Sequence, residues 1–203
     1  NTLKDLRNAG LLLDEDIIQL NLVKWASGIK SFKRLDYLLD IYPKVLSIPL
    51  PSGDFAIHPN NYVGDRKDVD VFERILRAGM DHYPEQYGFL FRRNVFGERA
   101  ITQAIHNFGK EETLRLIQTI IPSANEYPIL HQVFRYTPEL CDDFIDRYPD
   151  AIYLKDDKGR NLLHVSVKAG NLKSSSCLLM MIHSAKACIE ELDPVTNLYP
   201  FML

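Results

Sequence analysis

The feature that most constrains this chain is a helix stop that recurs along it. Apolar runs with the three- and four-residue spacing of one helix face repeatedly end in an aromatic or apolar residue followed by proline. Proline has no N–H and crowds the residue before it, so each such pair is predicted to end a helix and turn the chain extended. These stops contain Pro43, Pro84, Pro122 and Pro149. Repeated stops of this kind are typical of a stack of helical hairpins.

A second set of landmarks lies after the stops, where a glycine precedes a short apolar segment that predicts a new helix. The segments begin at Gly53, Gly97 and Gly159, and the fifth residue after each glycine is His58, Thr102 or His164. His131 lies 33 residues before His164. The landmarks at 58, 102, 131 and 164 are separated by 44, 29 and 33 residues, and repeats of this size predict a solenoid with insertions.

One segment carries a family resemblance. The stretch DDKGRNLLHVSVKAG at 156–170 resembles the opening of an ankyrin repeat, D-x-x-G-x-T-P-L-H-x-A-x-x-x-G. The matching positions are Asp156, Gly159, Leu163, His164 and Gly170, and the departures are Asn161, Leu162 and Ser166. The resemblance is good over about 94–203 and weak over 44–93, and before that only a helical pattern is present.

The resemblance implies an all-α fold, an ankyrin-like solenoid of stacked antiparallel helix pairs joined by turns that contain glycine and proline. Residues 1–43 are expected to form an N-terminal helical hairpin, either a cap or a degenerate repeat, with Asp14 and Ser31 as the helix N-caps. Residues 44–203 are expected to be degenerate repeats, with the last one truncated.

The landmark histidines are given a structural role by the same resemblance. In ankyrin repeats this ring hydrogen-bonds backbone and orients the loop beneath the first helix. His131 and His164 both stand at that position, so we expect neither to be a metal ligand or a catalytic base. Gly97 and Gly159 are expected to be turn glycines with positive φ rather than parts of a phosphate loop.

Several kinds of chemistry find little support in the sequence. The three cysteines form no CxxC pair, which argues against zinc and disulfides and favours an intracellular location, cytoplasmic or nuclear. Cys141 precedes two aspartates, and neither G-x-S-x-G nor HExxH occurs, so we expect no enzyme, no metal and no cofactor. No apolar run is long enough for membrane insertion.

A nucleic-acid partner is also not favoured. The segment FLFRRNVFGER at 89–99 interleaves arginine with phenylalanine and could form a stacking platform. With a net charge of −3, the preferred interpretation is that the phenylalanines belong to the core and the arginines cover a turn.

What remains is a binding module, because ankyrin repeats usually recognise other proteins. The resemblance implies a non-enzymatic interaction module or scaffold that binds another protein through the concave face. The outward turn and first-helix positions fall on Glu98, His106, Asn107, Asn125, Tyr127, Arg135, Tyr136, Asp157, Lys158, Arg160 and Lys168. Tyrosine and arginine are enriched at interface hot spots, so the expected anchors are Tyr127, Arg135, Tyr136 and Arg160.

Two alternatives stay open. The chain could be an architectural subunit packed permanently in a larger assembly or, with less support, an enzyme. The sequence also leaves open whether a partner binds the concave face or the convex face made by the proline-terminated helices.

Overall fold

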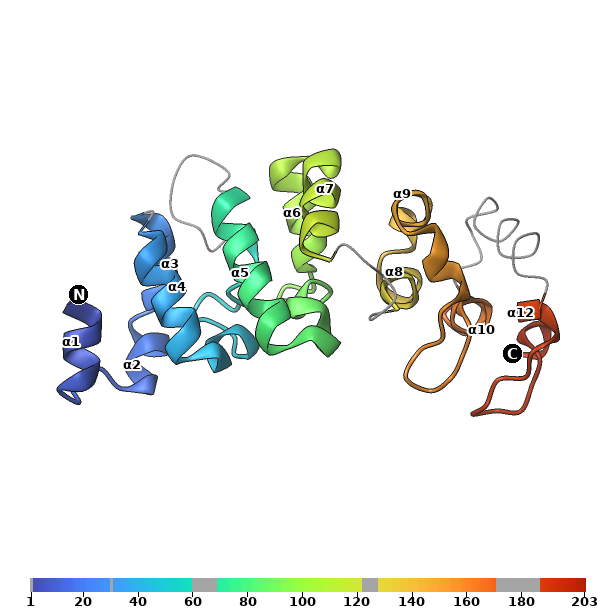
Figure 1. Cartoon of the computed structure of the whole chain (residues 1–203), viewed down its shortest axis with the longest axis horizontal. Helices are drawn as coiled ribbons and strands as arrows, with labels where there is room; N and C mark the ends of the chain where they lie inside the picture. The colour runs from blue at the N-terminus through green and yellow to red at the C-terminus, as the bar shows by residue number, and fades with distance from the viewer. Residues whose placement is uncertain (1, 30, 60–68, 122–127, 171–186) are drawn as a thin grey trace. The chain divides into compact units, whose positions relative to one another are not determined.

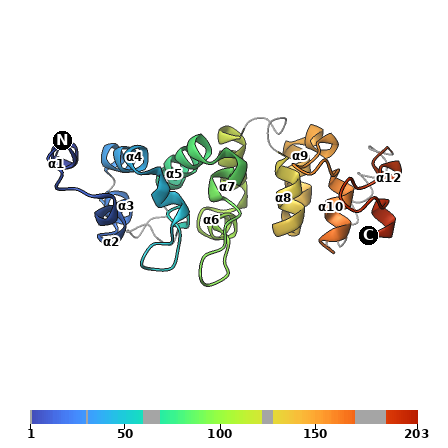
Figure 2. The ribbon, with the colours of Figure 1, turned by 90° about the horizontal axis from the view of Figure 1, so that it is seen from below.

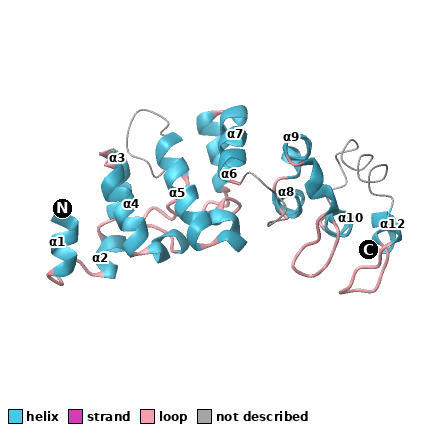
Figure 3. Ribbon diagram, viewed as in Figure 1, coloured by secondary structure: helices cyan, strands magenta, loops and turns pink. Residues whose placement is uncertain are grey.

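A computed structural model describes residues 2–29, 31–59, 69–121, 128–170 and 187–203. Within these ranges the chain consists of helices and turns, and its β features are two isolated bridges, Arg93–Arg99 and Lys155–Asn161 (Figure 3). The predicted all-α class is therefore confirmed. The chain divides into two compact units, Asn1–Ile120 and Ile121–Leu203, and each is described by itself.

The first unit is a succession of helices in which neighbours along the chain pack together. Its elements are α1 (Thr2–Asn8), α2 (Asp14–Gln19), α3 (Leu22–Gly28), α4 (Phe32–Ile41), η1 (Pro43–Ser47), α5 (Val69–His82), η3 (Pro84–Phe89), α6 (Ala100–Phe108) and α7 (Lys110–Ile120). Figures 1 and 2 show α3 beside α4 and α6 beside α7, and α5 contacts both α4 and α7. The core contains fully buried Leu35, Phe72 and Ile75.

The second unit is built around one central helix. Its elements are α8 (Ile129–Tyr136), η4 (Pro138–Leu140), α9 (Cys141–Arg147), η5 (Pro149–Tyr153), α10 (Leu162–Lys168), α12 (Ala187–Glu190) and η6 (Pro200–Met202). α8 packs against both α9 and α10, and α10 contacts α12 and η6. Phe134 of α8 and Phe144 of α9 are buried in this core.

The predicted proline stops are confirmed at three positions. α4, α5 and α9 end one residue before the Tyr-Pro pairs that contain Pro43, Pro84 and Pro149, whereas Pro122 lies outside the described residues. The expectation that the chain then turns extended is wrong, because each of these prolines begins a 3-10 helix. At each stop the residue before proline leaves the helical region, and the fixed φ of proline suits the first position of a new helical turn.

The residue before proline has the same conformation ahead of four described 3-10 helices, η1, η3, η4 and η5. Tyr42, Tyr83, Thr137 and Tyr148 have φ between −144° and −132° and ψ between 55° and 65°. Thr137 precedes Pro138, a stop that the sequence pattern did not single out.

The N-terminal segment differs from the single hairpin predicted for residues 1–43, since it holds four helices, α1 to α4. The expected helix after Asp14 is divided at Asn21, which has φ 49°, into α2 and α3. Asparagine tolerates this left-handed conformation better than most residues, and no Gly or Pro marked the break. Leu13, not Asp14, is the N-cap of α2, whereas Ser31 does stand at the N-cap of α4.

Three turns share one hydrogen-bond pattern. In Leu50–Asp54, Asn94–Glu98 and Asp156–Arg160, the first N–H donates to the last carbonyl at 2.7, 2.9 and 2.9 Å. The fourth residue of each turn donates its N–H back to the first carbonyl. That fourth residue is Gly53, Gly97 or Gly159, with φ of 85°, 83° and 73°. The predicted turn role of Gly97 and Gly159 is confirmed, because a positive φ of this size favours glycine.

Candidate functional site

The landmark histidines connect helices to the turns that follow them. His131 Nε2 lies 3.2 Å from the carbonyl oxygen of Arg160, and His164 Nε2 lies 2.9 Å from that of Glu191. A carbonyl oxygen can only accept, so each ring donates from Nε2. Both side chains are buried, and the predicted hydrogen bond from these rings to backbone is confirmed.

His58 makes the equivalent contact in the first unit. Its Nε2 lies 3.3 Å from the carbonyl oxygen of Glu98, and its Nδ1 accepts from the N–H of Phe55 at 3.2 Å. Glu98 and Arg160 are the last residues of their turns, so His58 and His131 contact corresponding positions. The His131 ring thus links the turn Asp156–Arg160 to α8, and the His58 ring links the turn Asn94–Glu98 to the segment Phe55–His58.

Burial determines how these rings titrate. It lowers the pKa of His131 to about 4, although Asp156 and the hydrogen bond to the Arg160 carbonyl act in the opposite direction. Burial also lowers the pKa of His58. Both rings are therefore neutral near pH 7, which suits a hydrogen-bonded scaffold better than a base that exchanges protons at that pH. In the described ranges, no group of three or more His, Cys, Asp or Glu residues could hold a metal ion.

The turn Asp156–Arg160 is organised by its first carboxylate. Asp156 Oδ1 accepts from the backbone N–H of Lys158 at 3.0 Å and of Arg160 at 2.9 Å. Its Oδ2 accepts from Arg160 Nε at 2.9 Å and from Nη2 at 2.5 Å. Burial alone would raise the pKa of Asp156, but these hydrogen bonds outweigh it and lower the pKa below its ordinary value. The carboxylate is therefore ionised, and the turn is held in one conformation.

Arg160 does not point outward as predicted. The residue is 5% exposed, because its guanidinium pairs with the buried carboxylate of Asp156. The interpretation of Arg160 as an exposed anchor is wrong. The four-residue separation of Asp156 and Arg160 was the available signal for this pair, but such spacing is informative within helices and these residues lie in a turn.

α10 begins directly after this turn. Asn161 is its N-cap, and Asn161 Oδ1 accepts from the N–H of His164 at 3.1 Å. Asn161 Nδ2 donates to the carbonyl oxygen of Cys188 at 3.0 Å. Lys168 lies in the last turn of α10, where a positive charge interacts favourably with the helix dipole.

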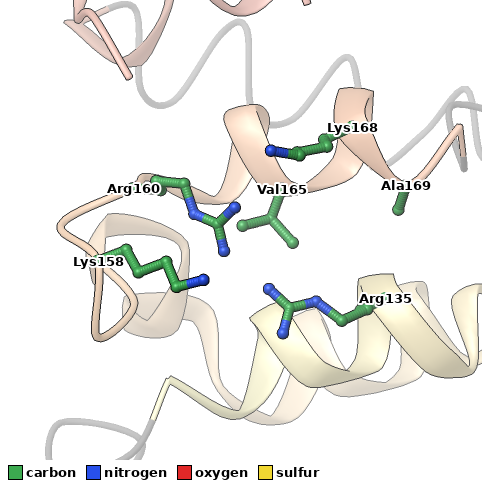
Figure 4. Close-up of a pocket in the computed structure, with 6 residues that line it drawn as sticks. All are labelled: Arg135, Lys158, Arg160, Val165, Lys168 and Ala169. Carbon is green, nitrogen blue, oxygen red and sulfur yellow. The ribbon is translucent and has the colours of Figure 1, made fainter. Parts of the chain in front are cut away.

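Between α8, the turn and α10 lies a cleft of about 320 Å³, which we call the basic cleft. It is lined by Arg135, Lys158, Arg160, Val165, Lys168 and Ala169. Figure 4 shows Lys158, Arg160 and Arg135 directing their charged ends into the same space, with Val165 beside it. The structure thus brings four of the sequence-predicted site residues together: Arg135, Lys158, Arg160 and Lys168.

Positive charge is in excess in the basic cleft. Asp156 is the carboxylate closest to Arg135, with Oδ2 3.9 Å from Nη2, and its oxygens already accept hydrogen bonds from Arg160 and backbone. Arg135 also lies over the ring of Tyr136, 5.8 Å from the centroid. Among the described residues, the ammonium groups of Lys158 and Lys168 have no ion-pair partner. The arrangement can therefore accept an anion with several oxygen atoms.

The other predicted site residues lie elsewhere. Tyr136 and Asp157 are exposed in the second unit, outside the lining of the basic cleft. Glu98, His106 and Asn107 belong to the first unit, where Glu98 accepts a hydrogen bond from Gln103 Nε2 at 2.6 Å. Asn125 and Tyr127 lie outside the described residues.

The first unit presents a feature that the sequence analysis missed. Val95 and Phe96, at the tip of the turn Asn94–Glu98, are 67% and 70% exposed. Phe89 and Phe91 are buried as expected, but the placement of Phe96 in the core is wrong. The sequence feature that predicts its exposure is its position directly before the turn glycine Gly97, which corresponds to the position of Lys158 before Gly159.

None of the described helices has both the length and the apolar character needed to cross a membrane. Comparison of the chain with models of known protein families, with curated proteins and with solved structures gave no match.

Proposed function

We propose that this chain is a degenerate ankyrin-like solenoid that acts as a non-enzymatic protein-binding module, centred on the basic cleft of its second unit. Recurrence supports the solenoid. The pre-proline conformation, the 3-10 turn after it and the glycine turn all repeat along the chain. His58 and His131 donate to corresponding positions of the following turns, as expected when similar units stack.

The single observation that carries the binding role is the convergence of Arg135, Lys158 and Lys168 on one cleft beside a turn that is already rigid. Side chains and loops that are ordered before association lose little entropy on binding. Arginine is also among the residue types that contribute most at protein interfaces.

The cysteines support a non-enzymatic, intracellular protein. Cys141 is buried on α9, and burial together with the nearby Glu191 raises the pKa of the Cys188 thiol. An activated nucleophile requires a lowered thiol pKa, which is the opposite shift. Neither Cys141 nor Cys188 forms a disulfide, which suits a reducing compartment.

The test compares two triple variants of the whole chain. The cleft variant carries Arg135→Gln, Lys158→Gln and Lys168→Gln. The control variant carries Lys33→Gln, Lys44→Gln and Arg93→Gln, which removes the same charges from positions outside the cleft. We expect the cleft variant to lose partner capture from native lysate at an unchanged melting temperature, while the control retains it. Equal capture by both variants would contradict the basic cleft as the binding site.

An architectural subunit is the second candidate, and exposed apolar side chains favour it. Val95 and Phe96 project from one turn, and Phe201 at the end of the chain is 72% exposed. Such residues are covered in permanent assemblies. This alternative predicts that the chain stays in a complex of fixed stoichiometry at high salt, and that Phe96→Ser releases it while the cleft variant does not.

A further inference from the structure

We propose that the basic cleft recognises the phosphate group of a phosphorylated serine or threonine in a partner protein. This inference rests on the proposed protein-binding function and adds the chemistry of the ligand. Basic residues from separate elements of the second unit meet at this cleft: Arg135 from α8 and Lys158 from the turn point into it, and Lys168 from α10 lines it.

The arrangement of these groups calls for an anion. Like charges that share a cleft destabilise one another, and an anion between them removes this repulsion. Asp156 cannot fill that role, because both of its oxygens accept hydrogen bonds from the turn that it organises. The same contacts hold Arg160 at the wall of the cleft, so its charge is fixed before any ligand arrives.

Phosphate fits this set of donors better than carboxylate does. A phosphorylated side chain carries about 1.5 to 2 negative charges at pH 7 and three acceptor oxygens. Arg135 has a planar set of N–H donors that suits two phosphate oxygens, and the ammonium groups of Lys158 and Lys168 are available as donors to the remaining oxygen. A carboxylate has one charge and two oxygens, which leaves part of the excess positive charge uncompensated.

The walls of the cleft favour a side chain of a protein over a nucleic acid. Val165 and Ala169 form an apolar side that suits the carbon atoms of a phosphorylated serine or threonine. A nucleic acid would require cations spaced along an extended backbone. Here the cations meet in a single cleft of about 320 Å³, and the exposed residue next to Lys158 is the acidic Asp157.

The experiment measures binding of degenerate peptide libraries to the whole chain by fluorescence anisotropy. Each library has one fixed central residue, phosphoserine, serine or glutamate, between mixed flanking positions. We expect the phosphoserine library to bind at least about tenfold more tightly than the glutamate library, and the serine library to show no binding. The cleft variant should lose this binding, and the control variant should retain it. Inorganic phosphate should compete, but more weakly than the peptides, because it makes none of the flanking contacts.

The possible outcomes separate this inference from the proposed function. Equal binding of the glutamate and phosphoserine libraries would overturn the inference and leave a module for acidic peptides. If inorganic phosphate binds as tightly as the peptides, the cleft is a site for the free ion. If a single-stranded oligonucleotide binds and none of the peptide libraries does, both proposals are overturned.

Capture from lysate gives a second readout. Phosphatase treatment of the lysate should abolish capture by the wild-type chain. If the wild-type chain still captures its partner after this treatment and the cleft variant does not, the phosphate inference is overturned and the proposed function stands. Capture by the cleft variant without binding of any library would overturn both proposals. If the triple variant melts at a lower temperature, Lys168→Gln, which changes one exposed side chain, replaces it in every arm.

Discussion

At the scale of single residues, burial decides what a charge contributes. Asp156 and Arg160 form an ion pair whose side chains are 5% and 6% exposed. Asp36 and Arg74 form a pair of similar length whose side chains are 50% and 38% exposed. Removing one partner of a buried pair leaves the other charge without water or a counter-ion, whereas an exposed charge is simply hydrated again.

Asp156→Ala should therefore lower the free energy of unfolding of the second unit by about 3–5 kcal/mol. It leaves Arg160 uncompensated and removes the acceptor for two backbone N–H groups of the turn. Asp36→Ala, the matched change in the exposed pair, should cost about 1 kcal/mol or less. Urea unfolding of both variants tests this difference, and equal costs would show that the turn does not depend on Asp156.

His164→Ala should destabilise the chain by about 1–3 kcal/mol, because it removes a fully buried ring and leaves the partly buried carbonyl oxygen of Glu191 without its ring donor. His106 is exposed on α6, so His106→Ala is the control and should change stability by about 0.5 kcal/mol or less. Thermal melting and metal analysis of both variants distinguish the roles. Stoichiometric zinc that is lost from His164→Ala at an unchanged melting temperature would refute the structural role.

At the scale of elements, close backbone contact determines how α5 and η3 pack. Gly79 lies in the interior of α5, where glycine is normally less stable than alanine. A Cβ at this position would lie 2.7 Å from Gly88 Cα and 2.8 Å from Gly88 O, which are backbone atoms. Gly88 itself has φ 56°, a conformation that favours glycine.

Gly79→Ala should therefore destabilise the first unit by about 1–3 kcal/mol, the usual cost of overpacking, although helix propensity alone predicts a gain of about 1 kcal/mol. Ala78→Gly, at the adjacent position of the same helix, should show the ordinary propensity effect and cost about 1 kcal/mol. Chemical unfolding of the two variants decides the matter. Stabilisation by Gly79→Ala would mean that α5 and η3 are not in close backbone contact.

At the scale of the whole molecule, both units contain a landmark histidine that burial keeps neutral. The pKa of His58 in the first unit is lowered, and that of His131 in the second is lowered to about 4. In the unfolded chain these rings titrate near their ordinary pKa of about 6.5. Between the two values the unfolded state binds more protons than the folded state, so stability decreases as the pH falls.

The second unit should lose about 3 kcal/mol of stability through His131 as the pH decreases from about 6.5 to about 4. Above about pH 6.5 this contribution is constant, and below about pH 4 it no longer grows. Glutamine does not titrate, so the free energy of unfolding of His131→Gln should fall less over the same pH interval. The difference from the wild type should equal the contribution of His131, about 3 kcal/mol. Urea unfolding at several pH values measures both curves. Parallel curves for the wild type and His131→Gln would show that His131 titrates normally in the fold.

The sequence by itself determined the features that depend on local chemistry. The proline stops at Pro43, Pro84 and Pro149, the positive φ of Gly97 and Gly159, and the all-α class follow from steric limits on single residues and from helical periodicity. The backbone hydrogen bonds of His131 and His164 were also anticipated, because a short motif specified them. The break at Asn21 was not, since an asparagine can occupy either the helical or the left-handed region.

The tertiary structure alone decided which side chains are available at the surface. Arg160 was predicted to be an exposed anchor, but in the fold its guanidinium pairs with the buried carboxylate of Asp156. Phe96 was predicted to lie in the core, but it is exposed at the tip of its turn. The basic cleft likewise required α8 and α10 to pack together, which brings Arg135 next to residues 158–168. Burial and charge pairing depend on contacts between segments that are distant in sequence, so a local pattern cannot fix them.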